Sequence, residues 1–339
     1  MNSFDTSSLK FVYGPVNAED VVRLPGVPWV VASHLNADIT SGMPPTRYGP
    51  GPLESIRIDT HEVRRLYPSP ESTVDWDRVT YPDCPEPPSS LSSHGLNVRP
   101  LGNKSFRLYV NNHGGRHSVE IIDVAVDGER LRSTWRGGVV APLEDLGVWP
   151  NGVAPLPGEG FILSGFNVAT WRPKYGWKRF ARYQGTRPGE RLVFGPGTGG
   201  MSNGVELSRD GEWVFIADTL RQSVFRMPMI DGEQSVLKLN FGVNNLRWGE
   251  DGRLYVAGAV WPKFEHAEDE HKLFEQAQAV TGIIAAAIDP ETLAVDIVVN
   301  DAHGFAGTYG ATSTALQFEN QLWLSSEISD RIAILSLRT

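Results

Sequence analysis

The stretch MSNGVELSRDGEWVFIADTL, from Met201 to Leu220, is the segment that decides the fold class. Val205 and Leu207 alternate with other residues, residues 208–211 (SRDG) are typical of a turn, and residues 213–217 (WVFIA) have the composition of a second strand. The stretch therefore predicts a β-hairpin. Its first strand begins with Asn203 followed by glycine, and both are poor strand formers, so this position calls for a separate explanation.

The same hairpin pattern recurs along the chain, at starting points roughly 40 to 75 residues apart, which is typical of β-propeller blades. The other copies are residues 19–33, 94–113, 151–165, 244–258 and 312–326. We therefore predict an all-β fold, a six-bladed β-propeller with long loops, formed as a single domain by residues 1–339. Residues 264–278 (FEHAEDEHKLFEQAQ) are predicted to form one inserted helix near the channel mouth.

Composition excludes several classes of partner. The 339 residues carry a net charge of −9, which argues against binding to nucleic acid or to an anionic membrane. The single cysteine, Cys84, cannot form an internal disulfide and fits a reducing compartment. The first residues resemble no secretory signal, and no apolar run has the length of a membrane helix. We expect a cytoplasmic protein with a small-molecule substrate, and the oligomeric state stays open.

Each copy of the hairpin begins with polar side chains. In a propeller the first strand of each blade lines the central channel, so these residues should meet at one mouth of it. An asparagine at a strand start can also be a simple turn residue or cap. A ring of carboxylate and amide oxygens, however, is the ligand set that a hard divalent cation such as calcium prefers. The residues are Glu19, His94, Asn151, Asn203, Asn244 with Asn245, and Thr312 or Ser313.

Several of these motifs resemble a known superfamily. The stretch SNGVELSRDGEWVFIADT (202–219) is similar to the signature blade of the senescence marker protein/gluconolactonase family. The motifs AEDVVRLPG (18–26), SHGLNV (93–98) and VNNHGG (110–115) are closer to its paraoxonase and arylesterase branch. The resemblance covers most of the chain. It implies a six-bladed propeller in which one catalytic calcium ion polarises a lactone or ester carbonyl.

The resemblance also implies roles for individual residues. Glu19 matches the acidic calcium ligand of these families, and Asn151 and Asn203 match two amide ligands. Asn244 and Asn245 fall on the Asp-Asn pair of paraoxonases. Finally, the two histidines at positions 94 and 113 match the paraoxonase histidine dyad.

Two departures from the pattern change what can be expected. At Asn244 both branches carry a metal-binding carboxylate, which in gluconolactonases is also the proposed general base, whereas an amide cannot accept a proton at neutral pH. Glu19 is then the only carboxylate expected in the ring, and the site should bind calcium more weakly or accept another ion. Gly152 replaces the aspartate that binds a second, structural calcium in paraoxonases. Asp20 keeps one ligand of that second site and should point away from the ring.

The base in a hydrolytic reaction must then be a histidine. The ordinary pKa of histidine, about 6.5, suits His94 to deprotonate the attacking water near neutral pH. His113, at the far end of the same hairpin, could orient His94 or relay protons from it. Either histidine could also be a hydrogen-bonded structural residue. His117 is expected at the surface.

The sequence therefore favours a metal-dependent lactonase or arylesterase-like hydrolase with a hydrophobic or aromatic substrate. The aromatic residues expected near the channel mouth are Trp171, Tyr175, Trp177, Trp261 and Phe264, although propeller aromatics also pack between blades. Two alternatives stay open. One is a non-hydrolytic enzyme on the same scaffold, with a strictosidine synthase-like condensation or an isomerisation, and the other is a ligand-binding propeller.

Overall fold

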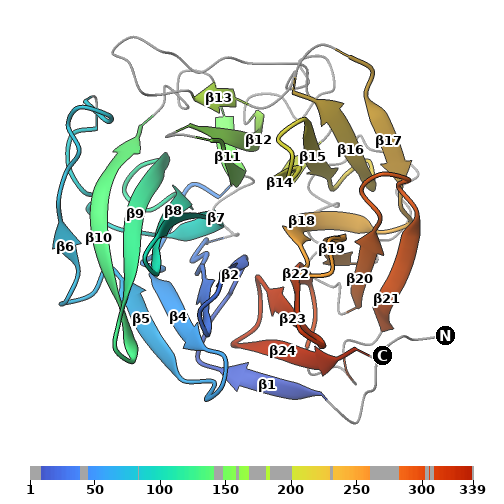
Figure 1. The fold of residues 1–339 in the computed structure, drawn as a ribbon, viewed down its shortest axis with the longest axis horizontal. Coiled ribbons are helices and arrows are strands. Elements are labelled where there is room, and N and C mark those ends of the chain that lie inside the picture. Colours follow the sequence, from blue (N-terminus) through green and yellow to red (C-terminus); the bar gives the residue numbers. More distant parts are fainter. Residues whose placement is uncertain are drawn as a thin grey trace.

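The described part of the chain forms six β-sheets arranged in a ring around a common axis in the computed structural model (Figure 1), and the term channel denotes the space along this axis, into which side chains of the inner strands project. The structure describes residues 9–38, 45–82, 84–140, 148–157, 160–167, 181–183, 201–229, 232–259, 282–301, 305 and 309–337. The predicted six-bladed β-propeller is confirmed. The helix predicted over residues 264–278 lies outside the described residues, and within them no helix has the length and apolarity needed to cross a membrane.

Each sheet extends outward from an inner strand that lies beside the channel (Figure 1). The six sheets, each from its inner strand outward, are β2 (Val21–Leu24), β3 (Trp29–Ala32), β4 (Leu53–Arg57) and β5 (Val63–Tyr67); β7 (Ser93–Gly102), β8 (Ser105–Asn112), β9 (Ser118–Asp127), β10 (Arg130–Val139) and β6 (Thr73–Val74); β11 (Val148–Pro155), β12 (Phe161–Asn167) and β13 (Ala181–Tyr183); β14 (Ser202–Leu207), β15 (Trp213–Asp218), β16 (Ser223–Pro228) and β17 (Ser235–Lys238); β18 (Gly242–Trp248), β19 (Leu254–Ala259), β20 (Ile283–Ile288) and β21 (Val295–Asp301); and β22 (Thr312–Phe318), β23 (Gln321–Ser326), β24 (Arg331–Ser336) and β1 (Lys10–Tyr13). The six hairpins expected from the sequence supply the first two strands of these sheets.

The last sheet joins the two ends of the described chain. Strand β1 pairs antiparallel with β24, with Lys10 opposite Ile334 and Tyr13 opposite Arg331. Val12 in β1 is buried against the apolar residues of this sheet and of its neighbour. This pairing closes the ring of blades, so that β24 is not left as an unpaired edge strand.

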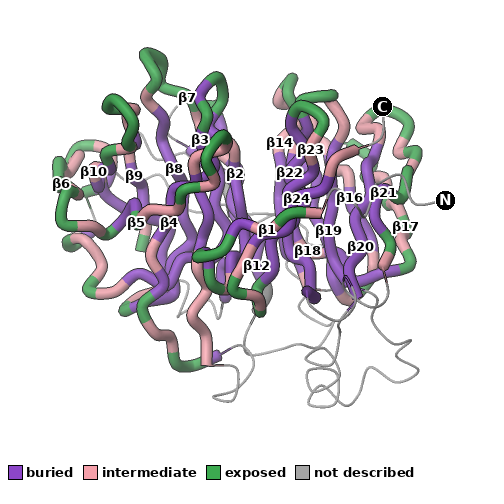
Figure 2. Tube along the Cα trace, turned by 90° about the horizontal axis from the view of Figure 1, so that it is seen from below, coloured by how far each residue is buried: buried purple, intermediate pink, exposed green. Residues whose placement is uncertain are grey.

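Apolar side chains fill the spaces between neighbouring sheets. Figure 2 shows buried residues along the middle of the strands and exposed residues at the turns. Trp29, Trp135 and Trp323 are all at most 1 % exposed. One apolar cluster joins the sheet that starts with β2 to the sheet that starts with β7. The hydrophobic effect therefore stabilises the contacts between blades rather than a single central core, and the channel is left to polar residues.

The polar residues at the channel mouth lie on irregularities in the strand pairing. In five hairpins two residues of the inner strand stand opposite one residue of the second strand. Such a bulge removes the extra residues from the regular ladder and redirects their side chains. The pairs are His94–Gly95, Asn151–Gly152, Asn203–Gly204, Asn244–Asn245 and Ser313–Thr314.

The glycine that follows each of three ring residues allows neighbouring inner strands to come close. A Cβ atom on Gly152 would lie 2.9 Å from the carbonyl oxygen of Asn203, and one on Gly204 would lie 2.6 Å from the Cα atom of Asn245. A Cβ atom on Gly95 would overlap the carbonyl oxygen of Asn151. The polar-residue–glycine pairs are thus explained by a steric requirement: glycine makes room for the next strand.

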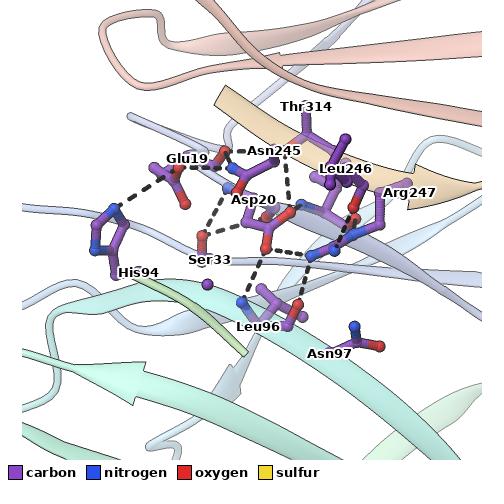
Figure 3. Close-up of polar contacts among 12 residues, drawn as sticks. Glu19, Asp20, Ser33, His94, Leu96, Asn97, Asn245, Leu246, Arg247 and Thr314 are labelled. Atoms are coloured by element: carbon purple, nitrogen blue, oxygen red, sulfur yellow. Dashed lines mark hydrogen bonds and ion pairs between the residues drawn. The ribbon is translucent and has the colours of Figure 1, made fainter. Parts of the chain in front are cut away.

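The buried side chain of Arg247, in β18, connects four of the six inner strands, and Figure 3 shows its contacts with Asp20 and Leu96. Its Nε atom donates a hydrogen bond to the Val21 carbonyl at 3.0 Å, and Nη2 donates to the Leu96 carbonyl. Nη1 contacts a carboxylate oxygen of Glu206 at 2.8 Å, and Nη2 is paired with Asp20. The guanidinium therefore links β2, β7, β14 and β18 in the middle of the channel.

The two carboxylates beside this guanidinium are held by further donors. Asp20 accepts hydrogen bonds from the Leu96 amide at 2.9 Å and from the Thr314 hydroxyl at 3.0 Å. Glu206 accepts one from the Asn97 side-chain amide at 3.1 Å. Burial raises the pKa of Glu206 to about 7, and the charge of Arg247 acts in the opposite direction. Both carboxylates thus depend on one cation for charge compensation.

We predict that Arg247→Met lowers the free energy of unfolding by about 3–5 kcal/mol, because it leaves two buried carboxylates without their cation. Urea unfolding of the purified variant measures this difference. Arg132→Met is the control: Arg132 is 72 % exposed in its ion pair with Asp127, so its loss should cost no more than about 1 kcal/mol. An Arg247→Met protein as stable as the parent would mean that other contacts hold the inner strands together.

Candidate active site

The predicted ring residues come together at one mouth of the channel. Glu19 precedes β2, and Asn151, Asn203 and Asn244 lie in β11, β14 and β18. The side chains of Glu19, Asn151 and Asn203 are 1–4 % exposed, and Asn244 is half-buried.

Ring residues of adjacent blades contact one another around the channel mouth. His94 Nε2 lies 3.7 Å from Glu19 Oε1, and the residue after His94 is packed against Asn151. The glycines after Asn151 and Asn203 are packed against the next inner strand in turn. Asn245 completes the circuit by donating a hydrogen bond from Nδ2 to Glu19 Oε1 at 2.7 Å.

Four carboxylate and amide oxygens of this ring are buried and have no hydrogen-bond donor, and the buried hydroxyl oxygen of Thr312 has no partner either. The four carboxylate and amide oxygens are Glu19 Oε2 and the Oδ1 atoms of Asn151, Asn203 and Asn244, and they come from four different blades. Buried polar atoms are nearly always paired, so four unpaired oxygens of one chemical type at one mouth are unusual. Carboxylate and amide oxygens are the atoms that calcium prefers as ligands. The residues present therefore fit a hard divalent cation.

The amide nitrogens of this ring hold the side chains in place. Asn203 Nδ2 donates to the Thr219 hydroxyl at 3.2 Å, and that hydroxyl donates to the Val243 carbonyl at 2.6 Å. Asn245 uses its Nδ2 on Glu19, as described above. Within the described residues no group of three or more His, Cys, Asp or Glu side chains is arranged to hold a metal ion. A cation at this mouth would therefore depend on amide oxygens.

The Glu19 carboxylate lies in an environment that disfavours its negative charge. Burial raises its pKa well above the ordinary value, the charges of Asp20 and Glu327 raise it further, and the Asn245 amide and the Arg247 charge act in the opposite direction. Glu327, which follows β23, is exposed, so solvent screens its charge and Asp20 is the buried carboxylate that acts on Glu19. A cation placed here would offset this unfavourable electrostatic energy.

His94 and His113 are in direct contact, as a dyad requires. His94 Nδ1 and His113 Nε2 are 2.9 Å apart, and both side chains are 3 % exposed. Burial lowers the pKa of His94 to about 3, although a hydrogen bond with the Pro150 backbone opposes the change. Burial lowers the pKa of His113 well below its ordinary value too, and His94 and His117 add to the effect. Both imidazoles are therefore neutral in this arrangement.

The structure corrects the expectation that His117 is only a surface residue. The side chain of His117 is half-buried, and its Nδ1 atom lies 2.7 Å from Nδ1 of His113. The ring of His113 lies nearly parallel to two aromatic rings, those of Trp149, at 4.5 Å between ring centroids, and Tyr48, at 5.1 Å. Trp149 Nε1 donates a hydrogen bond to the Tyr48 hydroxyl at 2.6 Å. Two aromatic rings thus fix the orientation of the middle imidazole.

Some functional candidates were missed or cannot be placed. Trp149 stands two residues before Asn151 in the same strand, and this position could have indicated that Trp149 lies at the site. No sequence feature near Tyr48 indicates that it contacts the histidines. The aromatic residues predicted to form the substrate wall, Trp171, Tyr175, Trp177, Trp261 and Phe264, lie outside the described residues.

Asp20 points away from the ring towards Arg247, as the alternation of the strand predicts. The aspartate that would complete a second calcium site is replaced by Gly152. A guanidinium therefore contacts the carboxylate that the resemblance assigns to that second ion.

Chemically, the mouth combines a cluster of unpaired oxygens with a neutral, hydrogen-bonded imidazole a few ångströms away. Such a combination can hold a cation and accept a proton at adjacent points. It provides no serine or cysteine nucleophile among the residues described above. Among the reaction types, addition of water to a polarised carbonyl suits this arrangement.

Comparisons with known proteins establish the fold and no more. No protein-family model and no curated protein matches the sequence. A gluconolactonase from Xanthomonas campestris has a similar structure, with a TM-score of 0.54 at 13 % identity over 97 % of this chain and 89 % of that chain. A luciferin-regenerating enzyme gives 0.53 at 10 % identity over 98 % and 94 %.

A third similar structure carries a different chemistry. The pyrroloquinoline quinone-bound aldose sugar dehydrogenase from Streptomyces coelicolor gives a TM-score of 0.52 at 12 % identity, over 98 % of each chain. Propellers with unrelated reactions are thus about equally similar, and fold alone does not select a function. The chain has the β-propeller fold that these enzymes, a gluconolactonase among them, share.

Proposed function

We propose that this protein is a calcium-dependent hydrolase of lactones or esters with hydrophobic or aromatic substrates. The observation that carries the proposal is the group of four buried, unpaired oxygens beside the neutral imidazole of His94. A purely structural ring would be expected to pair these oxygens. The similarity in fold to a gluconolactonase agrees with the proposal.

Glu19, Asn151, Asn203 and Asn244 would hold the cation through their unpaired oxygens. Asn245 would orient Glu19, because its amide nitrogen donates to the other carboxylate oxygen. One carboxylate and three neutral amides give a lower ligand charge than most strong calcium sites, so we expect a modest affinity. The ion, when bound, supplies the positive charge that polarises the substrate carbonyl.

His94 would accept the proton of the attacking water. Its Nδ1 atom is engaged with His113, so a proton on Nδ1 leaves Nε2, the atom nearer to Glu19, with a free lone pair. Asn244 cannot take this role because an amide is not a base at neutral pH. The stacked rings of Tyr48 and Trp149 keep the histidines in position and exclude water from the inner pair.

The cation site is tested by Asn203→Ala, which removes one neutral oxygen ligand and leaves the turn and apolar pattern of the hairpin intact. We expect calcium affinity, measured by calorimetry, to fall by about tenfold or more. Asn97→Ala is the matched control, since Asn97 is a buried channel amide bonded to Glu206 and is not part of the ring. Unchanged calcium affinity in Asn203→Ala would assign Asn203 a structural role.

The charge of the ring is tested by Asn244→Asp, which places a second carboxylate among the ligands. Repulsion from Glu19 and desolvation offset part of the gain, yet calcium binding should tighten roughly ten- to a thousandfold, because ligand charge is a main control of affinity. The same calorimetric titration measures the change. A folded Asn244→Asp protein that binds calcium no more tightly than the parent would exclude Asn244 as a ligand.

The reaction is tested on a panel of aliphatic and aromatic lactones and aryl esters. We expect turnover that is lost on chelation and restored by calcium. His94→Gln should lower turnover by roughly a hundredfold at unchanged calcium affinity, because glutamine cannot accept a proton. His61→Gln, in the turn between β4 and β5, serves as the control. Calcium binding without turnover of any substrate would favour a non-hydrolytic enzyme or a binding protein, and near-normal rates in His94→Gln would remove this histidine from the mechanism.

A further inference from the structure

Three imidazoles form one continuous row that leads away from the ring. His94 Nε2 faces Glu19, its Nδ1 lies 2.9 Å from Nε2 of His113, and Nδ1 of His113 lies 2.7 Å from Nδ1 of His117. Both separations are within hydrogen-bond range. The middle ring is joined through both of its nitrogens, which is the geometry that proton transfer along a row of imidazoles requires.

The environment of the row changes from one end to the other. His94 and His113 are each 3 % exposed, so a positive charge on either ring would be poorly solvated. His117 is half-buried and can be reached by water. Among the groups around it, His113 and Tyr48 are neutral, and the guanidinium of neighbouring Arg116 is paired with Glu120 at 2.9 Å. The outer ring is therefore the member of the row best able to carry a proton.

The row is held rigidly enough for its nitrogens to stay aligned. Trp149 lies parallel to His113 within 7° and Tyr48 within 21°, on rings that are hydrogen-bonded to each other. Tyr48 also contacts His117 edge-on, at 5.9 Å between centroids. One pair of aromatic side chains thus positions both the second and the third histidine.

We propose that His117 is the outer end of a three-imidazole proton relay, which acts through His94 and stores the proton of the attacking water until the leaving oxygen takes it. This inference rests on the proposed hydrolase function. As water adds to the carbonyl carbon, an O–H bond breaks and a bond forms from hydrogen to His94 Nε2. The proton on His94 Nδ1 moves to His113 Nε2, and the proton on His113 Nδ1 moves to His117 Nδ1.

The second half of the reaction runs the same steps backwards. As the bond between the carbonyl carbon and the leaving oxygen breaks, His94 Nε2 gives its proton to that oxygen, and the row returns to its first state. No proton is gained or lost by the protein, and no oxidant or reductant is needed. His117 touches neither the substrate nor the ring, so its contribution is to hold a charge that the two inner histidines cannot hold.

The test compares wild type, His117→Gln and His117→Ala on the same lactone and ester panel, in calcium. Glutamine can still make a hydrogen bond to His113 but cannot carry the proton. We expect kcat to fall about ten- to a hundredfold in both variants, with KM and calcium affinity little changed. Added imidazole should restore much of the rate in His117→Ala, while His61→Ala, with a histidine outside the row, should behave as wild type in both conditions.

The outcomes separate the relay from the function on which it rests. An active wild type together with His117 variants of equal kcat would overturn the relay alone. A loss of rate in His117→Ala that His117→Gln repairs and imidazole does not would show a merely structural role and would also overturn it. A wild-type protein that binds calcium and hydrolyses no member of the panel would overturn the proposed function, and the relay with it.

Discussion

The ion pairs of one buried arginine set the geometry on which the rest of the channel depends. Arg247 contacts groups from four inner strands, and these strands carry or directly follow Glu19, His94, Asn203 and Asn244. Asp20 corresponds to one ligand of a second calcium site in the paraoxonases that the motifs resemble, Gly152 removes another ligand of that site, and here the Asp20 carboxylate faces a guanidinium. A covalently attached cation cannot dissociate, so the centre of this propeller keeps its positive charge at any calcium concentration.

At the channel mouth, some polar groups of the ring residues have hydrogen-bond partners and others have none. The amide nitrogens of Asn203 and Asn245 are hydrogen-bonded, while Glu19 Oε2 and the Oδ1 atoms of Asn151, Asn203 and Asn244 at the mouth are unpaired. This division gives the mouth an excess of negative potential although only one of its four oxygen-bearing groups is a carboxylate. Burial raises the pKa of Glu19, and the negative charge of Asp20 raises it further.

The repeated hairpins and the ring could be predicted from the sequence because both depend on local patterns. Alternation and turn residues identify each hairpin, and the phase of the first strand places Glu19, His94 and Asn203 at one mouth. Arg247 could not be assigned in this way, since its partners at Asp20 and Leu96 are 227 and 151 residues away. His117 was misjudged for a similar reason: it follows two glycines in a loop, and only the fold of that loop brings it to His113.

The bulges at the channel mouth have a consequence for how such a protein can change during evolution. Because the ring residues stand outside the regular ladders, exchanging one of them removes no ladder hydrogen bond, while the glycine after it still admits the next strand. Selection can therefore replace a carboxylate by an amide in one blade at a time. Each single substitution can alter the preferred ion or the reaction while the protein still folds. The hairpin that carries Asn244 has the same bulge as its neighbours, so an exchange at this position would leave its strand pairing intact.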